Sequence, residues 1–152
     1  GILVNQPVEG DGKLGKFRTV DEFEDFNLNL ELNLPGDCNS GIYLRGIYEI
    51  QVKYNYGKKP TLRSMGALYG RIAPSESAEK QAGQWQDMEI ILYKRHVTVV
   101  LNGIRIIDNQ PVEGVTGAAL SANEFLPGPI LIQGNHRRGV SYRNIVLTPI
   151  LN

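Results

Sequence analysis

Between Phe26 and Leu34, apolar and polar side chains alternate without exception for nine residues. Side chains on an extended strand point to opposite faces in turn, so this stretch places five apolar groups on one face and four polar groups on the other. A helix would distribute both sets around its circumference. The pattern therefore predicts a half-buried strand rather than a helix.

Short apolar or alternating runs recur along the rest of the chain, and no segment has a convincing helical period. Asn102-Gly103 stands between two of the runs and is typical of the type I′ turn of a β-hairpin. The polar stretch Ala73–Gln84 contains a proline and a glycine and predicts a long loop. The further predicted strands are Ile42–Arg45, Tyr48–Lys53, Met88–Tyr93, Val97–Leu101, Ile104–Asp108, Ile130–Gln133 and Val140–Leu147.

Strands in succession without intervening helices predict an antiparallel, all-β fold. Two antiparallel sheets packed face to face, as a β-sandwich or jelly roll, bury such strands most simply. At 152 residues the chain has the length of one domain, and we treat residues 1–152 as a single unit. The 17 glycines and 8 prolines suit a fold with many turns.

Charge and cysteine content limit the classes of function. Lys and Arg number 16, Asp and Glu also number 16, and this balance argues against a nucleic-acid-binding protein. The one cysteine, Cys38, excludes an intrachain disulfide and a multi-thiolate zinc site. No apolar run reaches the roughly 20 residues of a membrane-spanning helix.

Polar side chains concentrate on the predicted strand pair between Asn39 and Lys53. Alternation places Tyr43 and Arg45 on one face of the first strand, and Glu49, Gln51 and Lys53 on one face of the second. If the chain turns at Gly46, both sets line one surface. Guanidinium, carboxylate, amide and phenol groups together suit sugars, which need donors, acceptors and an aromatic face. A solvated outer face with a surface ion pair is the alternative reading.

The same segment resembles the 3-keto-disaccharide hydrolase family, and further matches follow in order from about Phe23 to Pro149. The matching blocks are Asn39-Ser40-Gly41-Ile42-x-Leu44-Arg45-Gly46, Tyr48-Glu49-Ile50-Gln51-Val52, Gly66-Ala67-Leu68-Tyr69-Gly70, Ile72-Ala73-Pro74, Gly83-x-Trp85, Val99-Val100-Leu101-Asn102-Gly103, Asp108-Asn109, Gly128-Pro129-Ile130-x-Ile132-Gln133 and Tyr142-Arg143-Asn144-Ile145.

The resemblance implies a concanavalin A-like jelly roll in bacterial carbohydrate metabolism, with a periplasmic or cell-surface location and a carbohydrate as partner. Two departures stand out. The region before Phe23 is shortened relative to the family, and the closing block reads Gln133-Gly134-Asn135-His136 with Arg137 and Arg138 inserted, where the family more often has an acidic residue and Asp-His-Gly.

The family also implies a chemistry. A ketone at C3 of a glycoside acidifies the hydrogen on C2, so a base can remove it and the group on C1 can leave. On this basis we assign Glu49 as the base, Arg45 as the group that stabilises the enolate, and Tyr69 as donor to the leaving group or stacking platform. The predicted substrate contacts are Asn39, Tyr43, Gln51, Gln133 and His136.

Other sites are weaker. With only two histidines and no His-Glu-x-x-His spacing, we expect no cofactor, but calcium stays open, with Asp37, Asn39 and Asp108 as oxygen donors. Trp85 is either a sugar platform or, as we expect, a core anchor.

A single carboxylate in Glu49-Ile50-Gln51 does not fit the two-carboxylate hydrolysis of ordinary glycosides. Two alternatives to an enzyme remain, a noncatalytic carbohydrate-binding module and a protein-interaction domain of the laminin-G kind.

Overall fold

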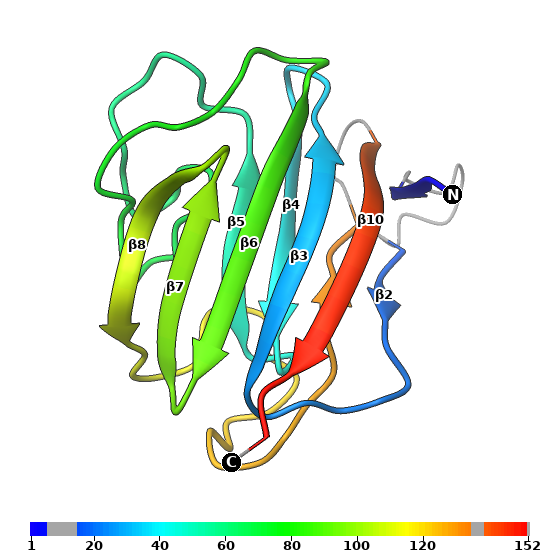
Figure 1. Cartoon of the computed structure of the whole chain (residues 1–152), viewed down its shortest axis with the longest axis vertical. Coiled ribbons are helices and arrows are strands. Elements are labelled where there is room, and N and C mark those ends of the chain that lie inside the picture. The colour runs from blue at the N-terminus through cyan, green and yellow to red at the C-terminus, as the bar shows by residue number, and fades with distance from the viewer. Residues whose placement is uncertain (6–14, 135–138, 152) are drawn as a thin grey trace.

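The computed structural model describes residues 1–5, 15–134 and 139–151, which form two antiparallel β-sheets. One sheet has six strands in the order β1-β10-β3-β6-β7-β8, and the other has four in the order β2-β9-β4-β5 (Figure 1). The bounds are β1 Leu3–Asn5, β2 Phe17–Arg18, β3 Phe26–Asn33, β4 Asn39–Leu44, β5 Tyr48–Lys53, β6 Trp85–Tyr93, β7 His96–Leu101, β8 Ile104–Pro111, β9 Leu131–Ile132 and β10 Val140–Pro149.

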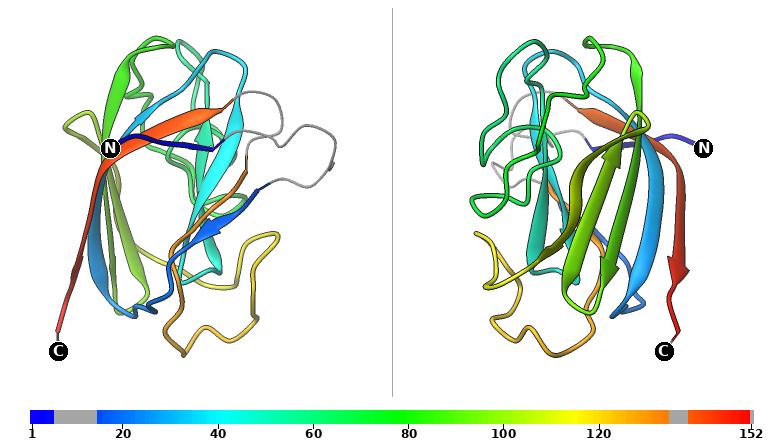
Figure 2. Two further views of the ribbon diagram at one scale, coloured as in Figure 1. Left: turned by 90° about the vertical axis from the view of Figure 1, so that its right-hand side faces the viewer. Right: turned by 60° about the vertical axis from the view of Figure 1, so that its left-hand side comes forward.

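The two sheets lie face to face as two layers with the core between them (Figure 2). The leucines of β3 face inward, as the alternation predicts, while its polar residues face out. They meet residues such as Ile42, Tyr48 and Ile50 of the four-stranded sheet in one buried cluster. This is the predicted β-sandwich of jelly-roll type, and the fold class is confirmed.

Two hairpins depend on residues with positive φ. Between β7 and β8, Asn102 and Gly103 have φ of 52° and 81°, as the predicted type I′ turn requires. Between β4 and β5, Arg45 and Gly46 have φ of 54° and 68°, and the chain reverses within three residues. This second turn sets the register of the strand pair that carries the polar cluster.

The eight predicted strands are confirmed, with ends that differ by a few residues. β1 and β2 were not predicted, because strands of two or three residues are too short to show an alternation. Residues 73–84 form the expected loop. Ile72, just before the loop, forms an isolated β-bridge with Leu68. Across the described ranges there is no helix, and so none that could span a membrane.

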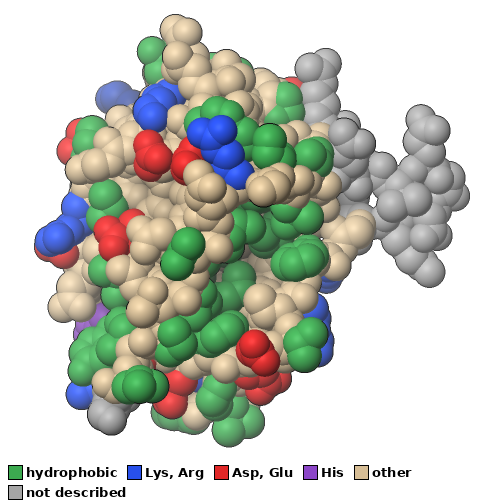
Figure 3. Space-filling model, turned by 45° about the vertical axis from the view of Figure 1, so that its right-hand side comes forward, with side chains coloured by type: hydrophobic (Ala, Val, Ile, Leu, Met, Phe, Trp, Pro, Cys, Tyr) green, Lys and Arg blue, Asp and Glu red, His purple; other side chains and the backbone are tan. Residues whose placement is uncertain are grey.

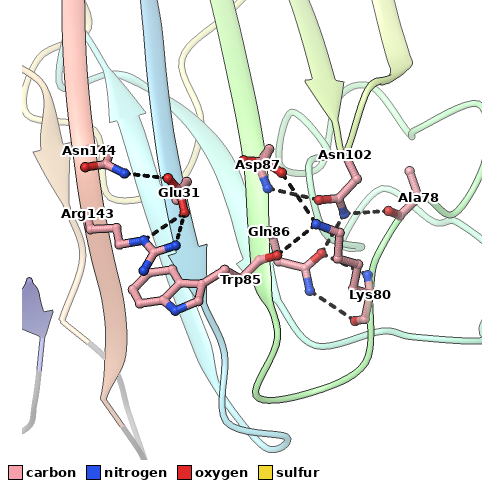
Figure 4. A network of polar contacts seen from close by, with 9 residues as sticks. All are labelled: Glu31, Ala78, Lys80, Trp85, Gln86, Asp87, Asn102, Arg143 and Asn144. Carbon is pink, nitrogen blue, oxygen red and sulfur yellow. Dashed lines mark hydrogen bonds and ion pairs between the residues drawn. The ribbon is translucent and has the colours of Figure 1, made fainter.

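The prediction that Trp85 anchors the core is wrong. Trp85 begins β6 on the outer face of the six-stranded sheet, where the Arg143 guanidinium carbon lies 3.9 Å from the centre of its ring (Figure 4). Arg143 Nε in turn donates to Glu31 at 2.7 Å. Hydrogen bonds from Asn144 and Arg143 lower the pKa of Glu31. Alternation explains the placement, since Gln86 and Met88 take the inward positions.

Candidate active site

A cavity of about 620 Å³ lies on the outer face of the four-stranded sheet. Its floor is the β4–β5 ladder, where Tyr43 lies opposite Glu49, Gly41 opposite Gln51, and Asn39 opposite Lys53. Each pair shares one face of the sheet, so the ladder places these side chains in a row. The lining residues are Asp37, Cys38, Asn39, Tyr43, Glu49, Gln51, Lys53, Arg63, Tyr69, Gly117, Ala118 and Gln133.

One wall comes from the loop that follows β5. The backbone N–H of Tyr69 donates to the carbonyl of Glu49 at 2.9 Å, and Gln51 exchanges backbone hydrogen bonds with Gly66 and Ala67. These bonds lay the loop along the free edge of β5 and hold the half-buried Tyr69 ring at the rim of the cavity. The Arg63 guanidinium carbon lies 5.8 Å from the centre of that ring, within range of a cation–π contact.

A second wall is the loop that follows β8. Thr116 Oγ1 accepts a hydrogen bond from the backbone N–H of Glu49 at 2.9 Å and donates to the carbonyl of Ile47 at 3.1 Å. The Tyr43 hydroxyl donates to the carbonyl of Gly117 at 3.1 Å. Both loops lie on the outer side of the four-stranded sheet, which turns a flat ladder into a hollow (Figure 2).

Glu49 is the most strongly perturbed acid of the cavity. The residue is only 6% exposed. Burial raises the pKa of Glu49 to about 7, because water no longer solvates the carboxylate, while a hydrogen bond with Tyr43 acts in the opposite direction. Gly41 makes room for it, since a Cβ at position 41 would lie 2.8 Å from Glu49 Cγ. At neutral pH this carboxyl group is thus close to half ionised.

The prediction that Arg45 shares this hollow is wrong. Its positive φ ends the alternation of β4, so the side chain turns away to the end of the sheet. Arg45 is 4% exposed, and its guanidinium donates to the carbonyls of Leu126 (Nε, 2.9 Å) and Glu124 (Nη2, 2.7 Å). Arg45 therefore joins the hairpin to the loop that follows β8 and does not line the cavity.

Most of the other predicted site residues do line the cavity. Six of them line the cavity together, and His136 lies outside the described residues. Asp37 and Asn39 also line it, but Asp108 lies on β8 and pairs with Arg105 at 3.2 Å, so the three proposed calcium donors do not form one site. The six are Asn39, Tyr43, Glu49, Gln51, Tyr69 and Gln133.

Of the residues on the two loops, sequence reasoning predicted Tyr69, through the family resemblance, and missed the others. Arg63 and Thr116 lie 14 and 67 residues beyond Glu49 in the chain, and no alternation connects them to the β4–β5 ladder. Lys53 was visible as a member of the polar face, whereas a cation on a loop carries no local signal of its position. Cys38 also lines the cavity, and burial raises the pKa of its thiol to about 11.

The surface outside this cavity has a mixed character. On the face shown in Figure 3, basic and acidic side chains are interspersed among apolar and neutral ones. The exposed ion pairs between Lys80 and Asp87 and between Arg105 and Asp108 are examples of the same mixing on the six-stranded sheet. Surface charges of opposite sign close together largely cancel at a distance.

Comparisons with known proteins agree with the fold. The chain is similar to a candidate glycosyl hydrolase from Parabacteroides distasonis, with a TM-score of 0.78 and 28% identity over 92% of this chain and 70% of that one. A second such protein of that organism gives 0.75 at 16% identity, over 99% and 81% of the two chains. A carbohydrate-binding module from Bacillus subtilis gives 0.51 at 8% identity, over 88% and 81%, and these two show a shared fold alone.

No curated protein matches the sequence. The profile of the 3-keto-α-glucoside-1,2-lyase-like domain matches residues 1–148, which is nearly the whole chain. The chain therefore belongs to the family of 3-keto-α-glucoside-1,2-lyase-like domains.

Proposed function

We propose that this protein cleaves 3-keto-glycosides by elimination, with Glu49 as the base. The observation that carries the proposal is the buried Glu49 carboxyl on the floor of a sugar-sized cavity, with a pKa of about 7. A base with a pKa near the working pH combines a useful ionised fraction with enough basicity to take a proton. The family and the kinship with a candidate glycosyl hydrolase support a carbohydrate as the ligand.

The reaction divides into three steps. The Glu49 carboxylate takes the proton from C2, and the electron pair of the C–H bond moves to form the enolate of the C3 ketone. The enolate then collapses, the ketone reforms, a C1–C2 double bond forms, and the group on C1 leaves with the bonding electrons and takes up a proton. Water adds to this enone at C1 and C2, which gives the free keto sugar.

The residues that line the cavity supply candidates for the remaining roles. Because Arg45 is held at the end of the sheet, the cations that line the cavity within the described part of the chain are Lys53 and Arg63. Tyr69 lies at the rim and has a hydroxyl to offer the departing oxygen. Positioned donors and cations of this kind stabilise the developing negative charge, often by several kcal/mol.

The alternative of ordinary glycoside hydrolysis needs two carboxyl groups roughly 5–10 Å apart. The second carboxylate in the cavity is Asp37, which precedes Asn39. Asn39 and Tyr43 are four residues apart on β4, about 13 Å at the usual rise of a strand. This places Asp37 toward the Lys53 end of the cavity and Glu49 at the other, which favours a one-carboxylate mechanism.

Incubation with methyl 3-keto-α-glucoside and with unoxidised methyl α-glucoside tests the proposal. We expect release of methanol from the oxidised compound alone, and loss of that release in Glu49→Gln. Release from the unoxidised compound would contradict the elimination mechanism. Binding of either compound without cleavage would indicate the noncatalytic carbohydrate-binding module instead.

A further inference from the structure

The carboxamide of Gln51 is a buried polar group with one half of its hydrogen bonding unmet. The residue is 3% exposed, and its Nε2 donates to Asn39 Oδ1 at 3.2 Å. Its Oε1 has no hydrogen-bond partner among the described residues. A buried carbonyl oxygen left without a donor destabilises a protein by about 1–3 kcal/mol, so such groups in a cavity indicate a place for a ligand.

The surroundings of Gln51 hold its buried side chain in place beside the cavity. Backbone hydrogen bonds to Gly66 and Ala67 fix the main chain of Gln51 along the loop after β5. Across the ladder stands Gly41, and the room left by its missing side chain is taken by the side chain of Glu49. Gln51 therefore lines the cavity on a rigid strand, two residues from Glu49 on the same face.

A carboxamide oxygen can only accept a hydrogen bond, whereas a sugar hydroxyl can donate one and a ketone oxygen cannot. We infer that Gln51 Oε1 recognises one hydroxyl of the sugar as a donor and excludes a carbonyl oxygen from that position, so that the keto group is directed to other residues of the cavity. The inference rests on the proposed function, because it takes the ligand to be an oxidised sugar.

Asn39 determines the orientation of the Gln51 carboxamide. Its Oδ1 accepts from Gln51 Nε2 and so fixes the orientation of the amide, in which the oxygen is the end left without a partner. Groups able to donate to the ketone oxygen line the same cavity, namely Tyr69, Lys53 and Arg63. The Tyr43 hydroxyl is already engaged by Gly117 and Glu49. In this arrangement Gln51 is the acceptor for a sugar hydroxyl, and other residues of the cavity are the donors for the ketone oxygen.

The test measures dissociation constants by calorimetry in the Glu49→Gln background, which prevents turnover. The probes are methyl 3-keto-α-glucoside and its analogues in which each hydroxyl in turn is replaced by hydrogen or by fluorine. We expect one position at which both replacements weaken binding about ten-fold, since neither hydrogen nor fluorine can donate. Adding Gln51→Leu should reduce that difference to less than two-fold, while Gln51→Glu, which keeps an acceptor, should preserve it.

Other outcomes overturn the inference. A fluorine analogue that binds like the parent at the sensitive position would show that Gln51 donates rather than accepts. Analogues that all bind like the parent, or a ten-fold difference that survives Gln51→Leu, would show that Gln51 does not recognise a hydroxyl. In these cases the proposed function stands if the wild type still cleaves the parent compound. Failure of the parent itself to bind, together with no cleavage by the wild type, would overturn both.

Discussion

At the scale of single residues, the site is governed by the conflict between burial and charge at Glu49. The carboxyl group gives up most of its hydration, and the hydrogen bond with Tyr43 compensates only in part, so the neutral form is favoured in the folded protein. A structural residue in this position would be more stable as an amide. An acid buried at this position is consistent with the proposed use of its proton.

The pH dependence of turnover follows from the pKa of Glu49. We expect kcat/KM for methyl 3-keto-α-glucoside to rise with pH and level off above about 7, because only the ionised carboxylate can take the C2 proton. Glu49→Gln should lower kcat by a factor of about 10² to 10⁴. The measurement is initial-rate kinetics from pH 5 to 9. A flat profile would exclude Glu49 as the base.

Stability should change in the opposite sense. The folded-state pKa of about 7 lies above the ordinary glutamate value of 4.5, so the folded protein binds the extra proton between these pH values. Unfolding free energy contributed by Glu49 is therefore fully present below pH 4.5 and is lost as the pH rises to about 7. Glu49→Gln should raise the free energy of unfolding by about 2–3 kcal/mol at pH 8 and by little at pH 4.5. Urea unfolding at both pH values measures this, and equal effects would contradict it.

At the scale of elements, the β4–β5 hairpin determines which polar groups meet. Its three-residue turn sets a register in which Tyr43 faces Glu49 and Gly41 faces Gln51. A slip of one residue would exchange the cavity-facing residues for core residues such as Ile42 and Ile50. The core therefore enforces the arrangement of the site.

Gly41 should be essential for the site and not for the fold. In Gly41→Ala the new Cβ would lie 2.8 and 2.9 Å from Glu49 Cγ and Cδ, so the carboxyl group must move. We expect kcat to fall at least ten-fold while the circular dichroism spectrum is unchanged. Gly36→Ala is the matched control, because nothing lies within 4 Å of its Cβ position. Equal activity of both variants would show that Glu49 need not occupy its present position.

The same hairpin shows where sequence reasoning succeeds and where it ends. Alternation correctly placed Tyr43, Glu49 and Gln51 on one face, because the period of a strand is a local property. It failed at Arg45, where a left-handed backbone conformation interrupts the period. In the sequence the alternation of polar and apolar residues continues through Arg45, and only the backbone geometry of the turn shows that the strand ends at Leu44.

At the scale of the whole molecule, the site depends on connections between distant segments. Tyr48 and the backbone of Gly114 both donate to Glu124, and Arg45 donates to the carbonyl of the same residue. These contacts hold the loop after β8 against the hairpin, and that loop carries Thr116 and its neighbours to the cavity. Contacts over such distances in sequence have no pattern to predict them from, which is why Arg63 and the loop after β8 were missed while the floor was predicted.

Arg45 should therefore act on stability rather than on ligand binding. Arg45→Ala removes buried, charged hydrogen bonds to Glu124 and Leu126, and we expect a loss of about 2–4 kcal/mol in the free energy of unfolding. Arg105→Ala, which breaks an exposed ion pair with Asp108, should lose less than about 1 kcal/mol. Chemical unfolding and calorimetric titration with methyl 3-keto-α-glucoside measure both effects. Weaker ligand binding without a loss of stability would show instead that Arg45 contributes to the binding site.

Trp85 offers a spectroscopic check on the layout of the two sheets. It is the only tryptophan, and it lies on the outer face of the six-stranded sheet under Arg143 (Figure 4). We expect its fluorescence to be unchanged when a sugar fills the cavity on the other sheet, and to shift to longer wavelength on global unfolding. Arg143→Ala should alter the emission of the folded protein without altering sugar affinity. A change in emission on saturation with ligand would place the sugar elsewhere.

The loop along β5 has a consequence for self-association. A bare outer strand presents unpaired backbone groups on which a second polypeptide can assemble, and this is a common route to aggregation. Here the main chain of Gly66, Ala67 and Tyr69 already occupies the backbone groups of Glu49 and Gln51. The strand that carries the proposed base is thus closed to recruitment by another copy along that stretch, and concentrating the protein should not block the entrance to its cavity by strand addition there.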